Sequence, residues 1–427
     1  MTLAAFEAIA TATAMPVVAR ELDALSAYTW AFNAYIVASL LAMVIAGLRC
    51  DATGPRGPIV AGIAAFAIGS VVAGAAPSML VLIAGRAGQG IGSGAVIVGL
   101  YVLIARAYPE SLRPKAFSAL AAAWVLPSLI GPLVAGWLAD SLSWRLVFWV
   151  VPIFVIPPLL LLLPHLAEHQ GGSPNPHARR RVVAGIVVTV GLLAMQDGLV
   201  RVTLLGGVEA GIGFILILGA GRTLLPAGAL SFARGLPTTV MTRGIIAAGY
   251  FSAEVFLPLA LVEIKGVSVT YAGLTLAVGA ASWAVGSFAQ SRLSGTADRS
   301  AAVRIGSLIV AVSILGLPLV LIPVVPAWFA AGFWAVGALG MGLAIPSISL
   351  QTMRLSPEAD QGMNSAALQI VDSVLVVIGT ALIGTVYAHA VAGAGVTAVT
   401  YSTMWIAAAV IVALAALVAP RMKSVAP

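Results

Sequence analysis

Fourteen apolar stretches follow one another along the chain of 427 residues, and most of them are long enough to cross a lipid bilayer as a helix. A spanning helix needs about 20 mostly apolar residues. Only 9% of the residues are charged and 61% are hydrophobic, whereas a soluble chain has roughly 25% charged residues. No water-soluble fold could bury this much apolar surface, so we predict an all-α integral membrane protein. The predicted spans are 2–19, 28–48, 58–76, 78–105, 116–138, 145–166, 182–200, 204–221, 240–262, 271–291, 302–322, 327–350, 363–388 and 398–419.

The stretches 182–200 and 204–221 are short, and Asp197 and Arg201 interrupt the apolar run around their junction. They are interpreted either as two spans or as a re-entrant or interfacial hairpin. The first interpretation gives fourteen helices across the membrane and the second gives twelve. The span at 2–19 has no secretory cleavage site behind it, so we expect a retained helix. The span begins almost at the first residue, so the natural chain could start further upstream.

Basic residues predict the orientation of the chain. If the N-terminus is cytoplasmic, most loop arginines and lysines face the cytoplasm, as the positive-inside rule requires. These residues are Arg49, Arg56, Arg106, Arg113, Lys115, Arg179, Arg180, Arg181, Arg222, Arg234, Arg292, Arg299, Arg304, Arg421 and Lys423. We therefore predict a multi-pass protein of the plasma (inner) membrane with both termini in the cytoplasm. The same rule explains the net charge of +7, so nucleic-acid binding is not expected.

One long polar segment divides the chain. Residues 167–181 are rich in proline, glycine, serine and charge, which is typical of a linker. Six predicted spans precede it. The predicted organisation is an N-terminal six-helix bundle at 1–166, a cytoplasmic basic linker at 167–181, an inserted helix pair with its loop at 182–238, and a C-terminal six-helix bundle at 239–427.

The glycine-rich segment Gly85–Ala95 fits the pattern of a dinucleotide-binding loop, and Glu110 even lies at the distance of a ribose-binding acid. The segment lies inside the apolar stretch 78–105, which leaves no room for the strand that such a loop follows. Glycines four residues apart instead predict close helix packing. Arg86 lies about eight residues into this helix, or roughly 12 Å deep at 1.5 Å per residue. That is too deep for its charge to reach the interface easily, so we expect a cavity or a partner.

The segment between the second and third predicted spans is a short charged turn. Four residues define it as a candidate cytoplasmic gating loop: Gly47, Asp51, Gly54 and Arg56. Asp51 could cap the following helix or pair with arginines of a neighbouring loop, and such a turn could latch two helices in one conformation. Ordinary turn chemistry is the alternative.

Several motifs resemble those of the major facilitator superfamily, especially its drug:proton antiporter branch with fourteen helices. The charged turn matches G-x-x-x-D-x-x-G-[RK]-[RK], except that Pro55 replaces one basic residue. Arg86, Gln89 and Gly90 match the fourth-helix motif R-x-x-Q-G. In the family this arginine is implicated in proton coupling, so the resemblance implies that role for Arg86.

The fifth predicted helix resembles the antiporter motif G-P-x-x-G-G, with Ala135 in place of one glycine. A proline removes a backbone hydrogen bond and small residues allow close contact, so a bend is expected there. The residues of this bend are Pro127, Gly131, Pro132 and Gly136. In the first helix Glu7 takes the place of the branch's acid, with its spacing to Pro16 kept. The resemblance covers nearly the whole chain and is weaker in its second half.

Among the acids within the predicted spans, Glu7, Asp197, Glu254 and Asp372 are the candidates for function. An acid in the membrane is costly unless it is protonated, paired or in contact with water. Burial favours its neutral form, which lets it exchange protons near neutral pH. We predict proton coupling through Glu7, Arg86, Glu254 and Asp372. The alternatives are an interfacial position for Glu7, a structural polar pair for Asp372 and turn chemistry for Asp197.

Candidate substrate contacts are polar, aromatic or pliable side chains near these acids or in neighbouring spans. They are Asn33, Tyr35, Gln89, Trp124, Tyr250, Phe256, Met341 and Gln369. Packing or interface anchoring is the alternative for each aromatic residue.

The residues and the resemblance together predict a proton-coupled secondary active transporter that exports small amphipathic or cationic compounds by alternating access, with its substrate near the membrane midplane. The expected partners are that small molecule, protons and membrane lipids, and the protein is expected to be a monomer. No catalytic set, metal cluster or nucleotide loop is found in the sequence, so we expect no enzyme activity, metal or cofactor. A proton-coupled nutrient symporter and a lipid-handling membrane protein are the alternatives.

Overall fold

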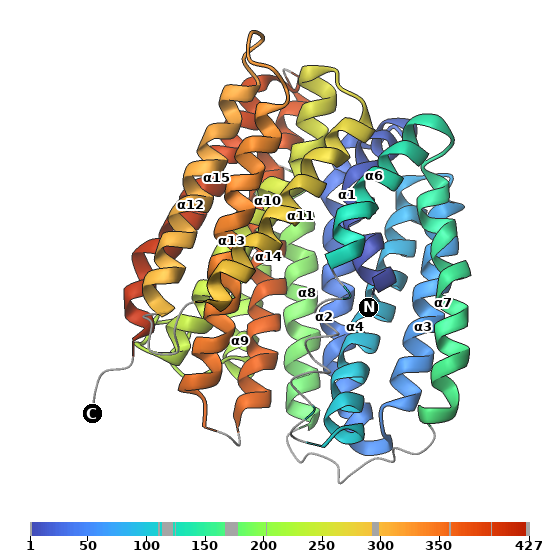
Figure 1. The fold of residues 1–427 in the computed structure, drawn as a ribbon, viewed down its shortest axis with the longest axis vertical. Helices are drawn as coiled ribbons and strands as arrows, with labels where there is room; N and C mark the ends of the chain where they lie inside the picture. The colour runs from blue at the N-terminus through green and yellow to red at the C-terminus, as the bar shows by residue number, and fades with distance from the viewer. Residues whose placement is uncertain are drawn as a thin grey trace. The chain divides into compact units, whose positions relative to one another are not determined.

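The computed structural model of the chain describes residues 2–109, 112, 123, 125–166, 178–201, 203–292, 299–357, 360–393 and 395–423. Fourteen α-helices form this part of the chain, which contains no strand (Figure 1). They are α1 (Thr2–Glu21), α2 (Tyr28–Thr53), α3 (Arg56–Gly74), α4 (Met79–Ala107), α6 (Val125–Ser141), α7 (Arg145–Leu166), α8 (Ala178–Arg201), α9 (Leu204–Leu224), α10 (Leu236–Lys265), α11 (Val269–Ser291), α12 (Arg299–Val320), α13 (Phe329–Leu355), α14 (Gln361–Ala392) and α15 (Ala398–Val418).

Length and composition allow eleven of the described helices to cross a membrane, namely α2–α4 and α8–α15. The prediction of an all-α, multi-pass membrane fold is therefore confirmed. In lipid a helix satisfies its backbone hydrogen bonds internally, which explains why apolar runs of this length become helices. Both α8 and α9, the helices of the uncertain pair, meet the criterion. The number of actual crossings stays a prediction.

Most predicted spans agree with the helices to within a few residues at each end. The helix predicted at 240–262 begins earlier, at Leu236, and ends at Lys265, where Gly266 adopts the left-handed conformation with φ 65°. The described part of the span predicted at 116–138 is α6. Residues 113–122 lie outside the described residues.

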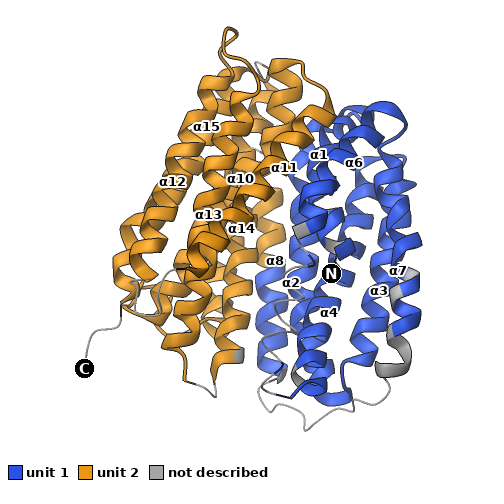
Figure 2. Cartoon of the chain, in the orientation of Figure 1, with its two compact units in different colours: residues 1–190 blue, residues 191–427 orange. Residues whose placement is uncertain are grey.

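The chain divides into two compact units, residues 1–190 and residues 191–427 (Figure 2). In unit 1, α4 packs against both α2 and α3, while α1 packs against α6. In unit 2, α13 packs against α11 and α12, and α10 packs against α14 and α15. The four-part organisation drawn from the sequence stays a prediction.

The glycines of α4 allow two neighbouring helices to approach its backbone. Gly90 and Gly94 contact the backbone of α2 at Tyr35 and Ser39, so a side chain at either glycine would collide with the carbonyl oxygen of that residue. On another face, a methyl group at Gly85 would lie 2.8 Å from the carbonyl oxygen of Gly69 in α3. The segment that fits the dinucleotide pattern is thus a continuous stretch of helix, and its glycines serve close packing.

Replacing Gly90 with alanine is expected to destabilise the protein. The new methyl group meets the backbone of α2, which cannot move aside as a flexible side chain does, and overpacking of this kind costs about 1–3 kcal/mol. Gly211→Ala is the matched control, because nothing lies within 4 Å of a methyl group there and alanine favours a helix by about 1 kcal/mol. Thermal unfolding in detergent should give a lower Tm for Gly90→Ala only. Equal Tm values for the two variants would contradict the packing described above.

Candidate functional site

A buried ion pair joins α1 to α4 in unit 1. Glu7 is 0% exposed and Arg86 is 2% exposed. The Nη1 of Arg86 donates to Oε1 of Glu7, and the hydroxyl of Thr11 donates to the same oxygen at 2.8 Å. The other oxygen, Oε2, has no hydrogen-bond partner among the described residues. Glu7 is therefore buried within unit 1, and its depth in the membrane stays a prediction.

Three further groups hold the Arg86 guanidinium in place. Its Nε donates to the carbonyl oxygen of Ala31 at 3.0 Å, and its Nη1 donates to Oε1 of Gln89 at 2.9 Å. The ring of Tyr35 lies 4.6 Å from its Cζ, which is a cation–π distance. Gln89 in turn donates to the hydroxyl of Ser70 at 2.9 Å. Four helices, α1 to α4, thus contribute to one polar cluster, which we call the Arg86 cluster.

The close packing of α4 makes the Arg86 cluster possible. Because Gly90 allows α2 to approach, Arg86 can reach the backbone oxygen of Ala31, and because Gly69 meets Gly85 and Gly88, Gln89 can reach Ser70 in α3. A charge within a membrane must find partners of this kind. Thr11, Ala31 and Ser70 were not identified from the sequence, since hydroxyl and carbonyl groups give no distinctive pattern.

A second charged cluster lies in unit 2. Arg243 of α10 donates from Nη2 to Oδ2 of Asp372 in α14 at 2.9 Å, and from Nε to the same oxygen at 3.1 Å. Its Nη1 donates to the hydroxyl of Ser349 in α13 at 3.2 Å. Arg243 and Asp372 are 15% and 20% exposed. Asp372 is thus paired, while its Oδ1 has no hydrogen-bond partner among the described residues. Arg243 was missed in the sequence, although a charge inside the span predicted at 240–262 was a usable signal.

Glu254 lies about three helical turns beyond Arg243 in α10 and is half-buried. It makes no hydrogen bond or ion pair with the residues that the structure describes. Tyr250, one turn earlier, stacks on Trp334 with ring centroids 4.5 Å apart and meets Trp283 edge-on at 5.7 Å. Among the described residues, the carboxylate of Glu254 has no hydrogen-bond partner, and it lies one turn after an aromatic cluster contributed by α10, α11 and α13.

The other predicted substrate contacts are not brought together in this way. Phe256 is fully buried against Tyr387, with ring centroids 5.5 Å apart, and Met341 is fully buried as well. Asn33 is buried and Gln369 is half-buried. Trp124 lies outside the described residues. Their role as substrate contacts stays a prediction.

In the candidate gating loop, α2 ends at Thr53 and Gly54 adopts φ 90°, a conformation that favours glycine. The residue before α3 is Pro55, and no side chain caps this helix, so Asp51 does not act as its cap. Arg106 of α4 donates to the carbonyl oxygen of Cys50 at 3.1 Å, which ties the end of α2 to α4. The gating role stays a prediction.

The predicted bend lies in α6, which runs as one helix with Pro132 inside. A methyl group at Gly131 would lie 3.4 Å from the ring of Phe6, the residue before Glu7 in α1. Pro127, Pro132 and Gly136 are buried. This segment therefore packs beside the helix that carries the buried acid, and whether it bends in the predicted way stays open to experiment.

The fold and the buried charges define a class: an integral, multi-pass membrane protein with polar clusters inside its helical bundles. The model of the Major Facilitator Superfamily matches residues 1–380, so the chain belongs to this family of membrane transporters.

Relatives with descriptive names support the assignment. An uncharacterised MFS-type transporter of Mycobacterium tuberculosis is 29% identical over 279 residues, which cover 61% of this chain and 39% of that protein. The matched region thus spans about two fifths of that relative's length. The multidrug transporter protein MdtP of Bacillus subtilis is 26% identical over 90% of this chain and 73% of its own. A probable multidrug-efflux transporter of Mycobacterium tuberculosis is 28% identical over 84% of this chain and 79% of its own.

Solved structures show the same fold. The crystal structure of a POT family transporter in complex with 5-aminolevulinic acid matches with a TM-score of 0.72, covering 99% of this chain and 96% of that chain. The sequence identity is 14%, so this likeness concerns the fold alone.

Breaking the buried pair from one side should be costly. Arg86→Gln leaves the Glu7 carboxylate buried without its cation, and removing one partner of a buried pair typically costs about 3–5 kcal/mol. Protonation of Glu7 removes that unpaired charge, so the loss should be smaller at pH 5 than at pH 8. Reversible unfolding in mixed micelles measures both values.

The double variant Glu7→Gln with Arg86→Gln serves as the control. It contains no unpaired charge at this site, so it should lose less stability than the sum of the two single variants. A pH-independent loss in Arg86→Gln, or additive losses, would argue against the buried pair.

Proposed function

We propose that the protein is a proton-coupled exporter of small amphipathic or cationic compounds, a multidrug efflux antiporter of the drug:proton branch with fourteen helices. It would work as a monomer in the plasma (inner) membrane by alternating access, with both termini in the cytoplasm. The observation that carries the proposal is the fully buried Glu7–Arg86 pair. Two relatives whose names describe multidrug transport support the choice of substrate class.

The proton site of the proposed cycle is Glu7. Its carboxylate receives hydrogen bonds from Arg86 and Thr11 on one oxygen, whereas Oε2 receives none from the described residues. Protonation of the Glu7 carboxylate removes its negative charge and therefore the attraction that holds it to Arg86. Arg86 would then keep the carbonyl oxygen of Ala31, the amide of Gln89 and the ring of Tyr35 as partners. When the pair opens, the guanidinium therefore keeps hydrogen-bond acceptors and the ring of Tyr35, which supports a reversible switch.

Glu254 is the proposed contact for a cationic substrate. A carboxylate beside aromatic rings suits an amphipathic cation, because the charge attracts the cation and the ring faces add cation–π attraction. Half-burial leaves it partly accessible. A proton and a cation compete for the same carboxylate, so binding of one opposes binding of the other. Asp372, which is paired with Arg243, is a further proposed member of the proton-coupling set.

In proteoliposomes, Glu7→Gln should abolish uptake of a cationic drug driven by an imposed pH gradient, because glutamine cannot take up the coupling proton. Exchange of labelled for unlabelled drug without a gradient should persist. A flux assay with a pH-sensitive dye inside the vesicles measures both activities, and the direction of the substrate-evoked pH change separates an antiporter from a symporter.

Glu21→Gln is the matched control. Glu21 lies at the other end of α1 and is also paired with an arginine, Arg145, but it is 48% exposed. It should retain gradient-driven uptake. Full coupling in Glu7→Gln would refute the proposed role of Glu7.

Glu254→Gln is expected to discriminate between substrates. Loss of the carboxylate should raise the KM for a monovalent cationic drug by about ten-fold or more, equivalent to about 1.4 kcal/mol, and change the KM for a neutral drug of similar size little. Transport of both drugs by the same vesicle preparation provides the comparison. An equal loss for both drugs would indicate a packing role for this residue instead.

A further inference from the structure

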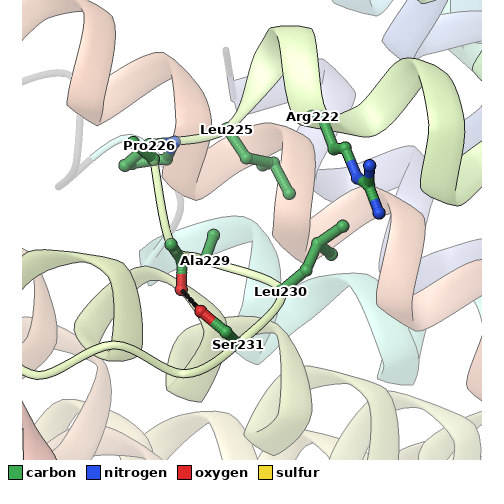
Figure 3. Close-up of a pocket in the computed structure, with 8 residues that line it drawn as sticks. Arg222, Leu225, Pro226, Ala229, Leu230 and Ser231 are labelled. Carbon is green, nitrogen blue, oxygen red and sulfur yellow. Dashed lines mark hydrogen bonds between the residues drawn. The ribbon is translucent and has the colours of Figure 1, made fainter.

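A cavity lies at the end of α9 in unit 2, away from the residues used in the proposed transport cycle. Its volume is about 380 Å³, which falls in the range of small-ligand pockets, about 300–1,000 Å³. The last turn of α9 and the following loop line it: Arg222, Leu225, Pro226, Gly228, Leu230 and Ser231. In Figure 3 the Arg222 guanidinium and the side chains of Leu225 and Leu230 converge on the space between helix and loop.

The charge of this cavity favours an anion. Among the residues that the structure describes, Arg222 is the only charged one lining the cavity, and it is exposed. It makes no hydrogen bond or ion pair with the described residues. The hydroxyl of Ser231 donates to the carbonyl oxygen of Gly228 at 3.1 Å and can still accept a bond. A guanidinium with all its donors available suits the oxygens of a phosphate.

The outer face of α9 continues the cavity along the helix. Six residues spaced three or four apart form this face, and we call it the α9 stripe: Leu204, Val208, Gly211, Ile215, Gly219 and Arg222. Residues at this spacing lie on one side of a helix. Leu204, Val208 and Ile215 are 88%, 56% and 68% exposed, and a methyl group at Gly211 or Gly219 would meet nothing within 4 Å. The stripe is thus a shallow apolar surface that ends at a cation.

The opposite face of α9 packs against α8. A methyl group at Gly198 of α8 would lie 2.7 Å from the amide nitrogen of Ala210, and one at Gly191 would lie 2.7 Å from the carbonyl oxygen of Gly213. The two helices therefore pack backbone to backbone, which fixes the direction in which the α9 stripe faces.

We propose that this cavity binds the phosphate head group of an anionic phospholipid, with one acyl chain lying along the α9 stripe. The cavity supplies a single positive charge beside apolar side chains, and the stripe supplies an apolar track of helical length. An amphipathic anion matches both the charged cavity and the apolar stripe, whereas a soluble phosphate matches only the charged cavity. Basic pockets on the cytoplasmic side recognise anionic lipids in the same way, and Arg222 belongs to the residues predicted to face the cytoplasm. The site is separate from the proposed transport cycle and does not depend on it.

The test uses the purified full chain, stripped of lipid in detergent, with phosphatidylglycerol, phosphatidylcholine of the same acyl chains, and inorganic phosphate as probes. Native mass spectrometry gives the Kd of each lipid, and thermal unfolding gives the accompanying rise in Tm. Phosphatidylglycerol should bind more tightly than phosphatidylcholine and should raise the Tm. Arg222→Gln should weaken phosphatidylglycerol binding by about five-fold, the effect of one basic residue at an anionic surface. Gly211→Leu should weaken both lipids by obstructing the stripe.

Arg234→Gln is the matched control, because Arg234 is also exposed and lies in the same loop but does not line the cavity. It should bind phosphatidylglycerol as the wild type does. Three outcomes would overturn the proposal: undiminished binding in Arg222→Gln, an equal loss in both arginine variants, or an Arg222-dependent Tm rise with inorganic phosphate alone. A fourth outcome would overturn the proposal as well. If the protein forms dimers that Gly211→Leu dissociates, with no change in lipid binding, the stripe would instead be an interface with a second copy of the chain.

Discussion

The pairing of Glu7 with Arg86 is the interaction on which the N-terminal unit depends. An isolated charge inside a bilayer is too costly to retain, so each member of the pair requires the other. The surrounding groups provide the remaining hydrogen bonds of the two charged side chains. The hydroxyl of Thr11 donates to Glu7, while the carbonyl oxygen of Ala31 and the amide oxygen of Gln89 accept from Arg86. Each of the helices α1 to α4 contributes a polar group to this cluster.

Close backbone packing provides the geometry that the pair requires. Lipid offers no hydrophobic gain for helix association, so small residues and direct polar contacts must hold membrane helices together. Glycines fulfil this role in both units, between α4 and its neighbours and again between α8 and α9. The polar clusters are therefore consequences of helix spacing as much as of the charged residues themselves.

The sequence alone predicts the helices well, because an apolar run of about 20 residues has few other possible structures in a membrane. It also identifies Arg86, since a charge inside such a run is conspicuous. It does not identify the partners. Arg243 was not identified, although it is a charge inside the span predicted at 240–262 and lies in a helix that begins at Leu236. Which acid pairs with which arginine depends on how the helices pack. A serine such as Ser70 cannot be distinguished in the sequence from other serines in a span, whose hydroxyl groups often bond only to their own helix backbone.

The glycine contacts of α4 also have a mechanical consequence. Because its backbone touches α2 on one side and α3 on another, these three helices can slide past one another only by breaking contacts along their whole length. Arg86, Gln89, Tyr35 and Ser70 therefore travel as a single rigid block. Glu7 and Thr11 belong to a different block, formed by α1 and the α6 helix packed on it through Phe6 and Gly131. A movement that separates the two buried charges is thus a displacement of α1 together with α6. The boundary between the two blocks is where this unit can change conformation.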